Sequence, residues 1–470
     1  MQSFTSETED RRRGAVLGMV LVVVVLVSVL GGGLLYYTAS VAAEVGRQVS
    51  AAQAFWTAEA GLQSLLAIGR AAQKPLEEID LVKNGWAGSV LRGNYTVTYT
   101  VLPGGSPFAN RLRLYHIESH GEAAGGQEVV VEVNADLPTF NQYMMFSNIG
   151  VTPDDQPVYF GDGDTIAGPV YANDQLNIWH DHPQNPIFVF PSPLGDEWLI
   201  MSAADSVNMH AGDLTVFEDD GSMYPDGQPQ SRLRLDQPEV SIDPIQEFFD
   251  DSKSAAQSGS PLSNLSGNYD MTFHDDGSVV YEQRGGSEGP KTNTIEEFGG
   301  AIYVNGDVYI SGVVDGDLTL VVEHGIHIDG DVVYESAQSP DPWTGGFDAD
   351  TVDDFLTLLT PEYVRLESQP GSKADGRTMH ASIYVTEDNP GDYYGLCAAD
   401  WDRNIGKPKL NLFGGVTQYR RGLLARPPNV TASGTSPQPF GYGKNFFYDE
   451  RMASRAGPYT SYLVSGWEYR

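Results

Sequence analysis

Cysteine is almost absent from this sequence of 470 residues, which contains a single thiol, that of Cys397. One thiol excludes a disulfide within the chain, a thiolate metal cluster and c-type haem attachment. Stability must therefore come from packing, hydrogen bonds or bound ions. We expect Cys397 itself to be a small buried apolar residue.

Basic residues are also scarce, with 28 Lys and Arg against 63 Asp and Glu, a formal charge of −35. Nucleic acid is excluded as a partner, because phosphate binding needs a basic surface. The acidic excess suits a soluble exported surface better than specific recruitment of cations. The 52 glycines, 28 prolines and 24 tyrosines indicate a loop-rich β protein rather than a helical bundle.

Long apolar runs are missing except near the N-terminus, where residues 15–37 carry no charge. A helix of this length spans a bilayer core of roughly 30 Å. Arg11, Arg12 and Arg13 precede it, so residues 1–13 are predicted to be cytoplasmic and the rest of the chain to lie outside, with a single pass. The alternative is a secretory signal peptide cleaved after Ala43, which would leave an orphan amphipathic helix.

The segments on either side of the apolar run resemble those of known proteins. A hydrophilic leader ends in three arginines and Gly14, and Ala54-Phe-Trp-Thr-Ala-Glu-Ala-Gly-Leu62 follows the predicted membrane helix. Together they resemble minor pilins of the PilX-like group and related pseudopilins. The resemblance implies a leader over residues 1–14, a cut by prepilin peptidase between Gly14 and Ala15, methylation of the new amine, and a pilin helix over residues 15–73.

Two positions in this helix are expected to act in filament assembly, Met19 and Glu59. Most pilins carry a glutamate where Met19 stands, and the resemblance implies that it pairs with the N-terminal amine of a neighbouring subunit. A chain without this carboxylate suits a tip or initiating position. Sequence drift is the alternative explanation.

Three segments after the helix alternate apolar and polar residues, 94–102, 111–122 and 127–136, with Gly125-Gly126 between the last two. This pattern predicts antiparallel strands joined by tight turns. The predicted fold is α+β: a long transmembrane pilin helix on an antiparallel meander (74–138), followed by a large mostly-β domain (139–470) that is a β-solenoid in part.

The distal domain loosely resembles an uncharacterised β-rich domain that follows PilX-like N-termini. The residues that carry this resemblance are Gly161-Asp-Gly-Asp164, Gly168-Pro-Val-Tyr-Ala-Asn173, Asn185-Pro-Ile-Phe188 and Gly441-Tyr-Gly-Lys-Asn-Phe-Phe-Tyr-Asp-Glu-Arg451. Tyr171 replaces a histidine that is usual in the relatives, so any metal role of that position does not transfer.

Within the distal domain, residues 251–295 are predicted to be a loop-rich insertion with a hairpin at Asp275-Asp-Gly277. Residues 301–334 contain three triads, Asn305-Gly-Asp307, Asp315-Gly-Asp317 and Asp329-Gly-Asp331. They favour either an antiparallel meander with type I′ turns or a parallel solenoid. Residues 348–360 are predicted to form a helix, with acidic residues in its first turn and Pro361 after its end.

Little in the sequence indicates catalysis. Gly285-Gly-Ser-Glu-Gly289 matches G-x-S-x-G, but it lies in a polar loop and Pro290 follows at once. His180-Asp-His182 has no third metal ligand in view, and His324 and His327 lack zinc-ligand spacing. We expect no enzyme activity. The one cofactor that the sequence favours is calcium, which hard carboxylates would bind, although acidic glycine turns can be turns alone. The candidate ligands are Asp162, Asp164, Asp307, Asp317 and Asp331.

The sequence therefore predicts a minor pilin. It would sit in the inner membrane, be cut by prepilin peptidase, and join other pilins in a type IV pilus or related filament at the cell surface. Its β-rich domain would serve assembly priming or surface adhesion. A tip pseudopilin of a type II secretion system is the first alternative, and a membrane-anchored surface adhesin or hydrolase is the second.

Overall fold

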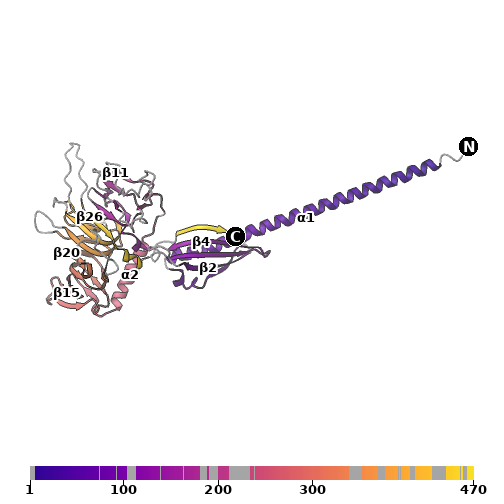
Figure 1. Ribbon diagram of the computed structural model, residues 1–470. Coiled ribbons are helices and arrows are strands. Elements are labelled where there is room, and N and C mark those ends of the chain that lie inside the picture. Colours follow the sequence, from indigo (N-terminus) through magenta and orange to yellow (C-terminus); the bar gives the residue numbers. More distant parts are fainter. Residues whose placement is uncertain are drawn as a thin grey trace. The chain divides into compact units, whose positions relative to one another are not determined.

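The computed structural model describes residues 6–72, 75–90, 93–102, 113–137, 139–161, 164–179, 188–189, 200–210, 233–237, 239–337, 352–368, 376–389, 391, 393–402, 408–425, 441–455, 457–458 and 463–469. The chain divides into two compact units (Figure 1). The first comprises Met1–Leu102, Leu114–Asp136 and Tyr462–Arg470, and the second comprises Pro103–Arg113 and Leu137–Ser461. A long N-terminal helix followed by a mostly-β region confirms the predicted α+β class.

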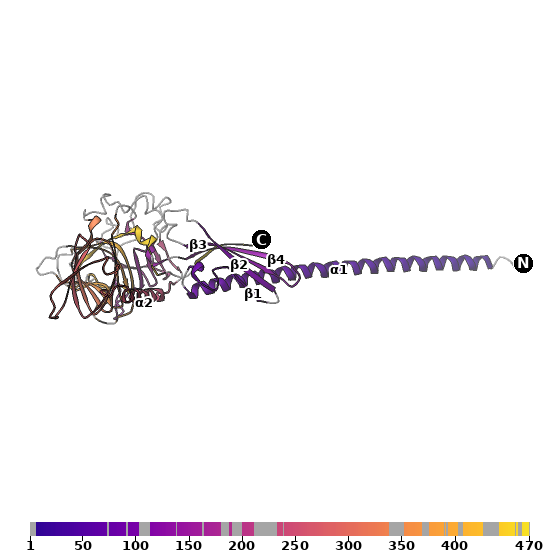
Figure 2. The same ribbon diagram turned by 90° about the horizontal axis from the view of Figure 1, so that it is seen from below.

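The first unit contains the helix α1 (Ser6–Ala72). It begins at Ser6, before residue 15, where the sequence predicted a start. Among the described residues it is the one helix long and apolar enough to cross a membrane, a property that a signal sequence shares. Its C-terminal part packs against the strands of the same unit (Figure 2).

The sheet of the first unit has the order β1-β2-β3-β4-β27. The bounds are η1 (Leu76–Glu78), β1 (Trp86–Val90), β2 (Gly93–Leu102), β3 (Arg113–Glu122), β4 (Glu128–Leu137) and β27 (Leu463–Tyr469). The pairs β1–β2, β2–β3 and β4–β27 are antiparallel. The three predicted strands are confirmed, but β27 was predicted to belong to the distal domain, which is wrong: it lies beside β4 (Figure 1).

The second unit consists mainly of short strands. Their bounds are η2 (Phe140–Gln142), β5 (Met145–Ile149), β6 (Thr165–Ala167), β7 (Val170–Ala172), β8 (Asn177–Trp179), β9 (Phe188–Val189), β10 (Ile200–Ser202), β11 (Asn208–His210), β12 (Leu233–Arg234), α2 (Asp243–Ser258), β13 (Asn264–Ser266), β14 (Tyr269–Phe273), β15 (Ser278–Gln283), β16 (Lys291–Thr294), β17 (Ala301–Asn305), β18 (Val308–Val314), β19 (Asp317–Val322), β20 (Gly325–Tyr334), η5 (Glu335–Ala337), β21 (Phe355–Thr360), β22 (Tyr363–Leu366), β23 (Arg377–Val385), β24 (Gly395–Ala398), β25 (Lys409–Arg420), β26 (Gly443–Tyr448) and η8 (Glu450–Ser454).

Apart from the hairpins β14–β15 and β15–β16, the described strand pairs of this unit are parallel. The pair β8–β11 forms a separate two-stranded sheet, and the other parallel pairs form three ladders. The first runs β13-β17-β19-β21-β23-β25-β5-β7-β10-β12. The second runs β14-β18-β20-β22-β24. The third uses the other halves of long strands and runs β18-β20-β23-β25-β26-β6-β9. The antiparallel alternative for residues 301–334 is therefore wrong.

These ladders close on a segment that comes earlier in the chain. Strands β5 to β12 precede β13 in the sequence, yet β5 pairs with β25 and β6 pairs with β26. The contacts that hold this junction link residues more than 250 positions apart, such as Val416 beside Met145. The ladders of this unit can form fully only when β5 and β6 have paired with β25 and β26.

The core consists of apolar side chains that repeat at one register position from strand to strand. In the first ladder this buried column is Ile302, Leu320, Leu358, Ile383, Val416, Met145, Val170 and Ile200. In the third it is Val332, Met379, Leu412, Phe446, Ile166 and Phe188. Stacking like residues in parallel register buries each of them between its neighbours.

The helix α2 was not predicted. It packs on β17 and β19 and buries Ile245, Phe249 and Ala256 against Tyr303 and other residues of the first ladder. Pro244 lies in its first turn, where the missing N–H costs nothing. The strands β13 to β16 follow it, so the predicted loop-rich insertion over 251–295 is wrong. Its hairpin at Asp275-Asp-Gly277 is confirmed, because β14 and β15 on either side are antiparallel.

The predicted helix over residues 348–360 is also wrong. Residues 348–351 lie outside the described residues, and Phe355–Thr360 form β21 between β19 and β23. All six residues of β21 are buried. A strand covered on both faces is apolar throughout, and that composition does not distinguish it from a buried helix.

Candidate functional site

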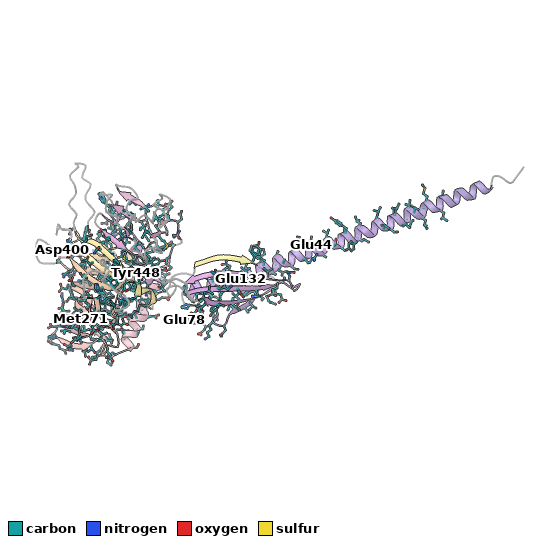
Figure 3. All side chains as sticks on the ribbon, in the orientation of Figure 1. Glu44, Glu78, Glu132, Met271, Asp400 and Tyr448 are labelled. Carbon is teal, nitrogen blue, oxygen red and sulfur yellow. The ribbon has the colours of Figure 1, made fainter. Side chains whose placement is uncertain are left out.

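The N-terminal half of α1 is the most unusual surface of the first unit. Every described side chain from residue 16 to residue 49 is exposed, and the large ones in 16–35 are Val, Leu and Met. Such a surface is unfavourable in water and requires lipid or protein around it. Glu44, which lies beyond this apolar segment, also projects outward from the helix (Figure 3).

The predicted processing and assembly residues all lie on this helix. Gly14 and Ala15 are in helical conformation, and their side chains lie outside the described ones. Met19 is 73% exposed, so the position of the missing glutamate faces the surroundings. Glu59 is half-buried and accepts a hydrogen bond from Gln63 Nε2 at 3.0 Å, one turn further along.

The pilin-like segment 54–62 forms the contact between α1 and its sheet. Ala54, Ala58 and Leu62 are fully buried, and Ser119 Oγ donates a hydrogen bond to the carbonyl oxygen of Ala58 at 2.6 Å. Gly121 of β3 faces this turn of helix, and a Cβ there would collide with backbone atoms of Ala54 and Ala58. We call these residues the helix–sheet contact. Small side chains in the segment are what allow the helix backbone to lie so near the sheet.

Gly61 completes this contact. A side chain there would meet the ring of Tyr95 at 2.7 Å and Ser119 Oγ at 2.9 Å. Phe55 and Trp56, next to the buried alanines, pack edge to face with ring centroids 5.2 Å apart. Thus the residues that carry the resemblance to pilins have a defined structural role.

In the second unit, Asp164 and Lys444 form a buried ion pair. Lys444 Nζ lies 2.7 Å from Asp164 Oδ2, and both side chains are at most 6% exposed. Asp164 also accepts hydrogen bonds from the backbone N–H groups of Lys444 and Gly161, each at 2.9 Å. Two separate motifs of the distal domain therefore meet at the junction between β26 and β6.

The end of the motif over residues 441–451 contains a second ion pair. Asp449 is fully buried and receives Arg451 Nη2 at 2.6 Å and Nε at 2.9 Å. Arg451 Nη1 donates to the carbonyl oxygens of Val352 and Asp354 at 2.7 and 2.9 Å. Tyr448, labelled in Figure 3, donates to the carbonyl oxygen of Asn141 at 2.6 Å. These motif residues connect distant chain segments rather than form an open site.

The aspartates predicted as calcium ligands are dispersed. Asp162 lies outside the described residues, and Asp164 is occupied by Lys444. Asp317 pairs with Arg455 at 2.5 Å. No group of three or more acidic, histidine or cysteine side chains in the described part of the chain could hold a metal ion.

The other two candidate calcium ligands, Asp307 and Asp331, form hydrogen bonds to neighbouring strands or turns. Asp307 accepts hydrogen bonds from the Gly325 N–H at 3.1 Å and from Asn268 Nδ2 at 3.2 Å. Asp331 accepts one from the Thr378 N–H at 2.9 Å. Two of the triads lie where the chain passes from one strand to the next, at β17–β18 and at β18–β19, whereas Asp329-Gly-Asp331 lies inside β20. Gly316 adopts a φ of +112°, which favours glycine.

Ser287 lies in an exposed turn between β15 and β16. The G-x-S-x-G match therefore lacks the strand-to-helix geometry of a nucleophile elbow. His180 and His182 lie outside the described residues. Cys397 is 2% exposed, as predicted, and burial raises its thiol pKa to about 12.

One set of polar side chains was missed by sequence reasoning. At a single register position of the second ladder, successive strands present Asp270, Tyr309, His327, Arg365 and Cys397, which we call the outer column. Its middle members lie at the centre of triplets with apolar ends, VYI, IHI and VRL. This repeated triplet is the signal that could have revealed the column.

The outer column is held together by stacking. The rings of Tyr309 and His327 are stacked with centroids 4.0 Å apart, and Arg284 covers Tyr309 from the other side at 3.1 Å. Arg365 Nη2 lies 3.1 Å from His327 Nδ1 and 4.3 Å separates its guanidinium from the ring of Tyr393. The aromatic faces are thereby largely covered by neighbours of the same chain.

Its charges are also paired. Glu367 Oε1 lies 2.6 Å from both His327 Nδ1 and Arg365 Nη2. Burial raises the pKa of the Glu367 carboxyl, but the hydrogen bonds from His327 and Arg365 outweigh it, so the net shift is downward. Because stacking and ion pairing occupy these groups, the outer column joins successive strands and does not offer an open binding site.

Comparisons with protein-family models, with curated proteins and with solved structures find no match to this chain. The exposed apolar part of α1 and the helix–sheet contact are the features that most need a functional explanation.

Proposed function

We propose that this chain is a minor pilin, inserted in the inner membrane by α1 and then incorporated into a type IV pilus or related filament with other pilins. The observation that carries the proposal is the division of α1 into two parts. Residues 16–49 are exposed and, over 16–35, apolar, whereas Ala54, Ala58 and Leu62 are buried in the helix–sheet contact. One part suits a bilayer or a bundle of neighbouring helices, and the other anchors a folded unit.

Methionine at position 19 supports a tip or initiating position. A glutamate there would bring a charge into an apolar environment and would need a cationic partner. The uncharged Met19 side chain needs no cationic partner and cannot form an ion pair with the N-terminal amine of a neighbouring subunit. The chain would then begin or cap an assembly instead of repeating within it.

We infer that the second unit is a parallel β-solenoid displayed for assembly priming or surface adhesion. The parallel ladders and the repeated apolar columns support this inference. Each turn buries its apolar face only against the next turn, which is the construction principle of solenoids. We propose a structural and binding role for it rather than catalysis.

A tip pseudopilin of a type II secretion system would share every one of these features. Copurification distinguishes the two hypotheses: a minor pilin should copurify with a type IV pilus, and a pseudopilin with a type II secretion system. A membrane-anchored surface adhesin or hydrolase would keep α1 but would not be processed at Gly14.

Coexpression of the full chain with a prepilin peptidase tests the proposal. The natural chain should lose residues 1–14, and Gly14→Val should abolish the cut. Gly18→Val is the matched control, because Gly18 lies one turn further along the helix with no atom within 4 Å of an added Cβ. It should be processed normally. A natural chain that stays uncut, or that is cut after Ala43, contradicts the proposal.

A further inference from the structure

Arg421 is a buried cation in the second unit. Its side chain is 2% exposed, and the centre of its guanidinium lies 3.5 Å from the centroid of the Phe160 ring, a member of the core. The residue follows β25 directly, and its backbone N–H donates to the carbonyl oxygen of Ile149 at 2.9 Å. The backbone at Arg421 is therefore held against β5.

One edge of this guanidinium is unsatisfied. The atoms Nε and Nη2 are buried, and neither has a hydrogen-bond partner among the described residues. These two nitrogens form the edge with which arginine binds a carboxylate or other anion through two parallel hydrogen bonds. An arginine cannot be neutralised by losing its proton at ordinary pH, so the cost of burying it requires a compensating group.

Nearby charges do not supply this compensation within the described part of the chain. Lys444 Nζ lies 5.9 Å from the centroid of the same Phe160 ring, and its ion-pair partner is Asp164 at 2.7 Å. Among the residues that the structure describes, the buried cations Lys444 and Arg421 therefore share the carboxylate of Asp164. Burial lowers the pKa of the Arg421 guanidinium to about 9, an effect that Asp164 only partly opposes. The ring of Phe160 offers a cation–π contact, which satisfies one face of the guanidinium but not its edge.

We propose that the Nε–Nη2 edge of Arg421 binds a small inorganic monovalent anion, chloride or a planar oxyanion of similar size, inside the second unit. The near-complete burial of Arg421 excludes a large organic ligand. The anion restores neutrality where β25 meets β5 and so stabilises the junction that closes the ladders. The proposal does not depend on whether the chain is a pilin.

Thermal unfolding of the full chain in detergent tests the proposal, with sodium chloride compared with sodium gluconate at equal ionic strength. Chloride should raise the Tm by roughly 3 °C through preferential binding to the folded chain. Arg421→Met should remove this difference. Arg420→Met is the matched control, because Arg420 is the adjacent arginine and pairs with Asp388. This variant should keep the chloride effect even if its Tm is lower.

Three results would overturn the proposal. The natural chain could be indifferent to chloride, or Arg421→Met could retain the whole effect. Asp162→Asn could also lower the Tm of the natural chain but not the Tm of the Arg421→Met variant. That result would make Asp162, and not an anion, the counter-ion of Arg421. If Arg421→Met does not fold, bromide-soaked crystals of the natural chain decide: an anomalous peak within hydrogen-bond distance of Nε and Nη2 supports the site, and an empty edge refutes it.

Discussion

The two units of this chain achieve stable sheets in opposite ways. In the first, β1 to β4 follow one another in sequence and in space, and its assigned pairs are antiparallel. In the second, parallel strands meet across long stretches of chain, and the ladder is completed by β5 to β12, which come before it. In the first unit the pairs from β1 to β3 join sequence neighbours and only β27 comes from the far end of the chain, whereas every parallel ladder joins distant segments.

The difference predicts where the chain is vulnerable. In the first unit the sheet depends on close approach of one helix, through the helix–sheet contact. In the second it depends on buried polar groups that join distant segments, such as the pair of Asp164 and Lys444. Substitutions at these places should affect the two units separately.

The largest effect is expected from Asp164→Asn in the second unit. The change removes the carboxylate that pairs with Lys444, and removing one partner of a buried ion pair costs about 4 kcal/mol. Chemical denaturation of the full chain in detergent measures the loss. Asp317→Asn is the control, because Asp317 forms an exposed pair with Arg455. Equal effects of the two substitutions would show that the junction is not held by this pair.

A smaller effect is expected from Gly121→Val in the first unit. The added side chain collides with the backbone at Ala54 and Ala58, and overpacking of this kind costs about 3 kcal/mol. Limited proteolysis with mass spectrometry should find new cuts in β1 to β4 while the second unit stays protected. Gly46→Ala, on an open part of α1, should produce no new cuts. New cuts in the second unit instead would contradict the separation of the two units.

The third prediction concerns pH and His380. Burial, with help from Arg451, lowers the pKa of this imidazole from 6.5 to about 4. The unfolded chain then binds the proton more readily, so the free energy of unfolding falls as pH drops through this range. The loss from His380 should be about 2 kcal/mol between pH 7 and pH 5.

Denaturation of His380→Asn across that pH range measures this contribution. The asparagine Oδ1 can replace His380 Nδ1, which accepts the Tyr334 N–H at 3.1 Å, but it does not titrate. The slope of stability against pH should therefore be smaller in the variant. His274→Asn, at an exposed position, controls for loss of a histidine. An unchanged slope in His380→Asn would exclude this residue as the source.

The smallest effect is expected in the outer column. Stacking of Tyr309 on His327 should contribute about 1 kcal/mol to the stability of the second unit. A double-mutant cycle with Tyr309→Ala and His327→Ala measures the coupling between the two rings. Coupling near zero would mean that the column does not join the strands energetically.

The sequence predicts the first unit well, and the reason is local pairing. The alternation in residues 94–102 and the Gly125-Gly126 turn identify strands that pair with their sequence neighbours. What it missed there is β27, because a strand at the far end of the chain carries no mark of pairing with β4. Residues 54–62 indicated a helix, but their small side chains become meaningful only beside Gly121.

The second unit was predicted only in outline, for physical reasons. Asp-Gly turns suit both hairpins and the corners between ladders, so residues 301–334 left both alternatives open. The run Phe355–Thr360 is buried on both faces, so it lacks the alternation of apolar and polar residues that identifies a strand. The acidic residues before it are typical of a helix N-terminus. The pairing of Asp164 with Lys444 joins residues 280 positions apart, and no local pattern specifies such a contact.

The most direct measurement of the proposed function is the N-terminus of the natural chain in sheared surface filaments, read by mass spectrometry. A minor pilin should be present in that fraction and begin at Ala15, with its amine methylated. A chain that is confined to the membrane fraction and begins at Met1, or one that begins after Ala43, would contradict the proposal.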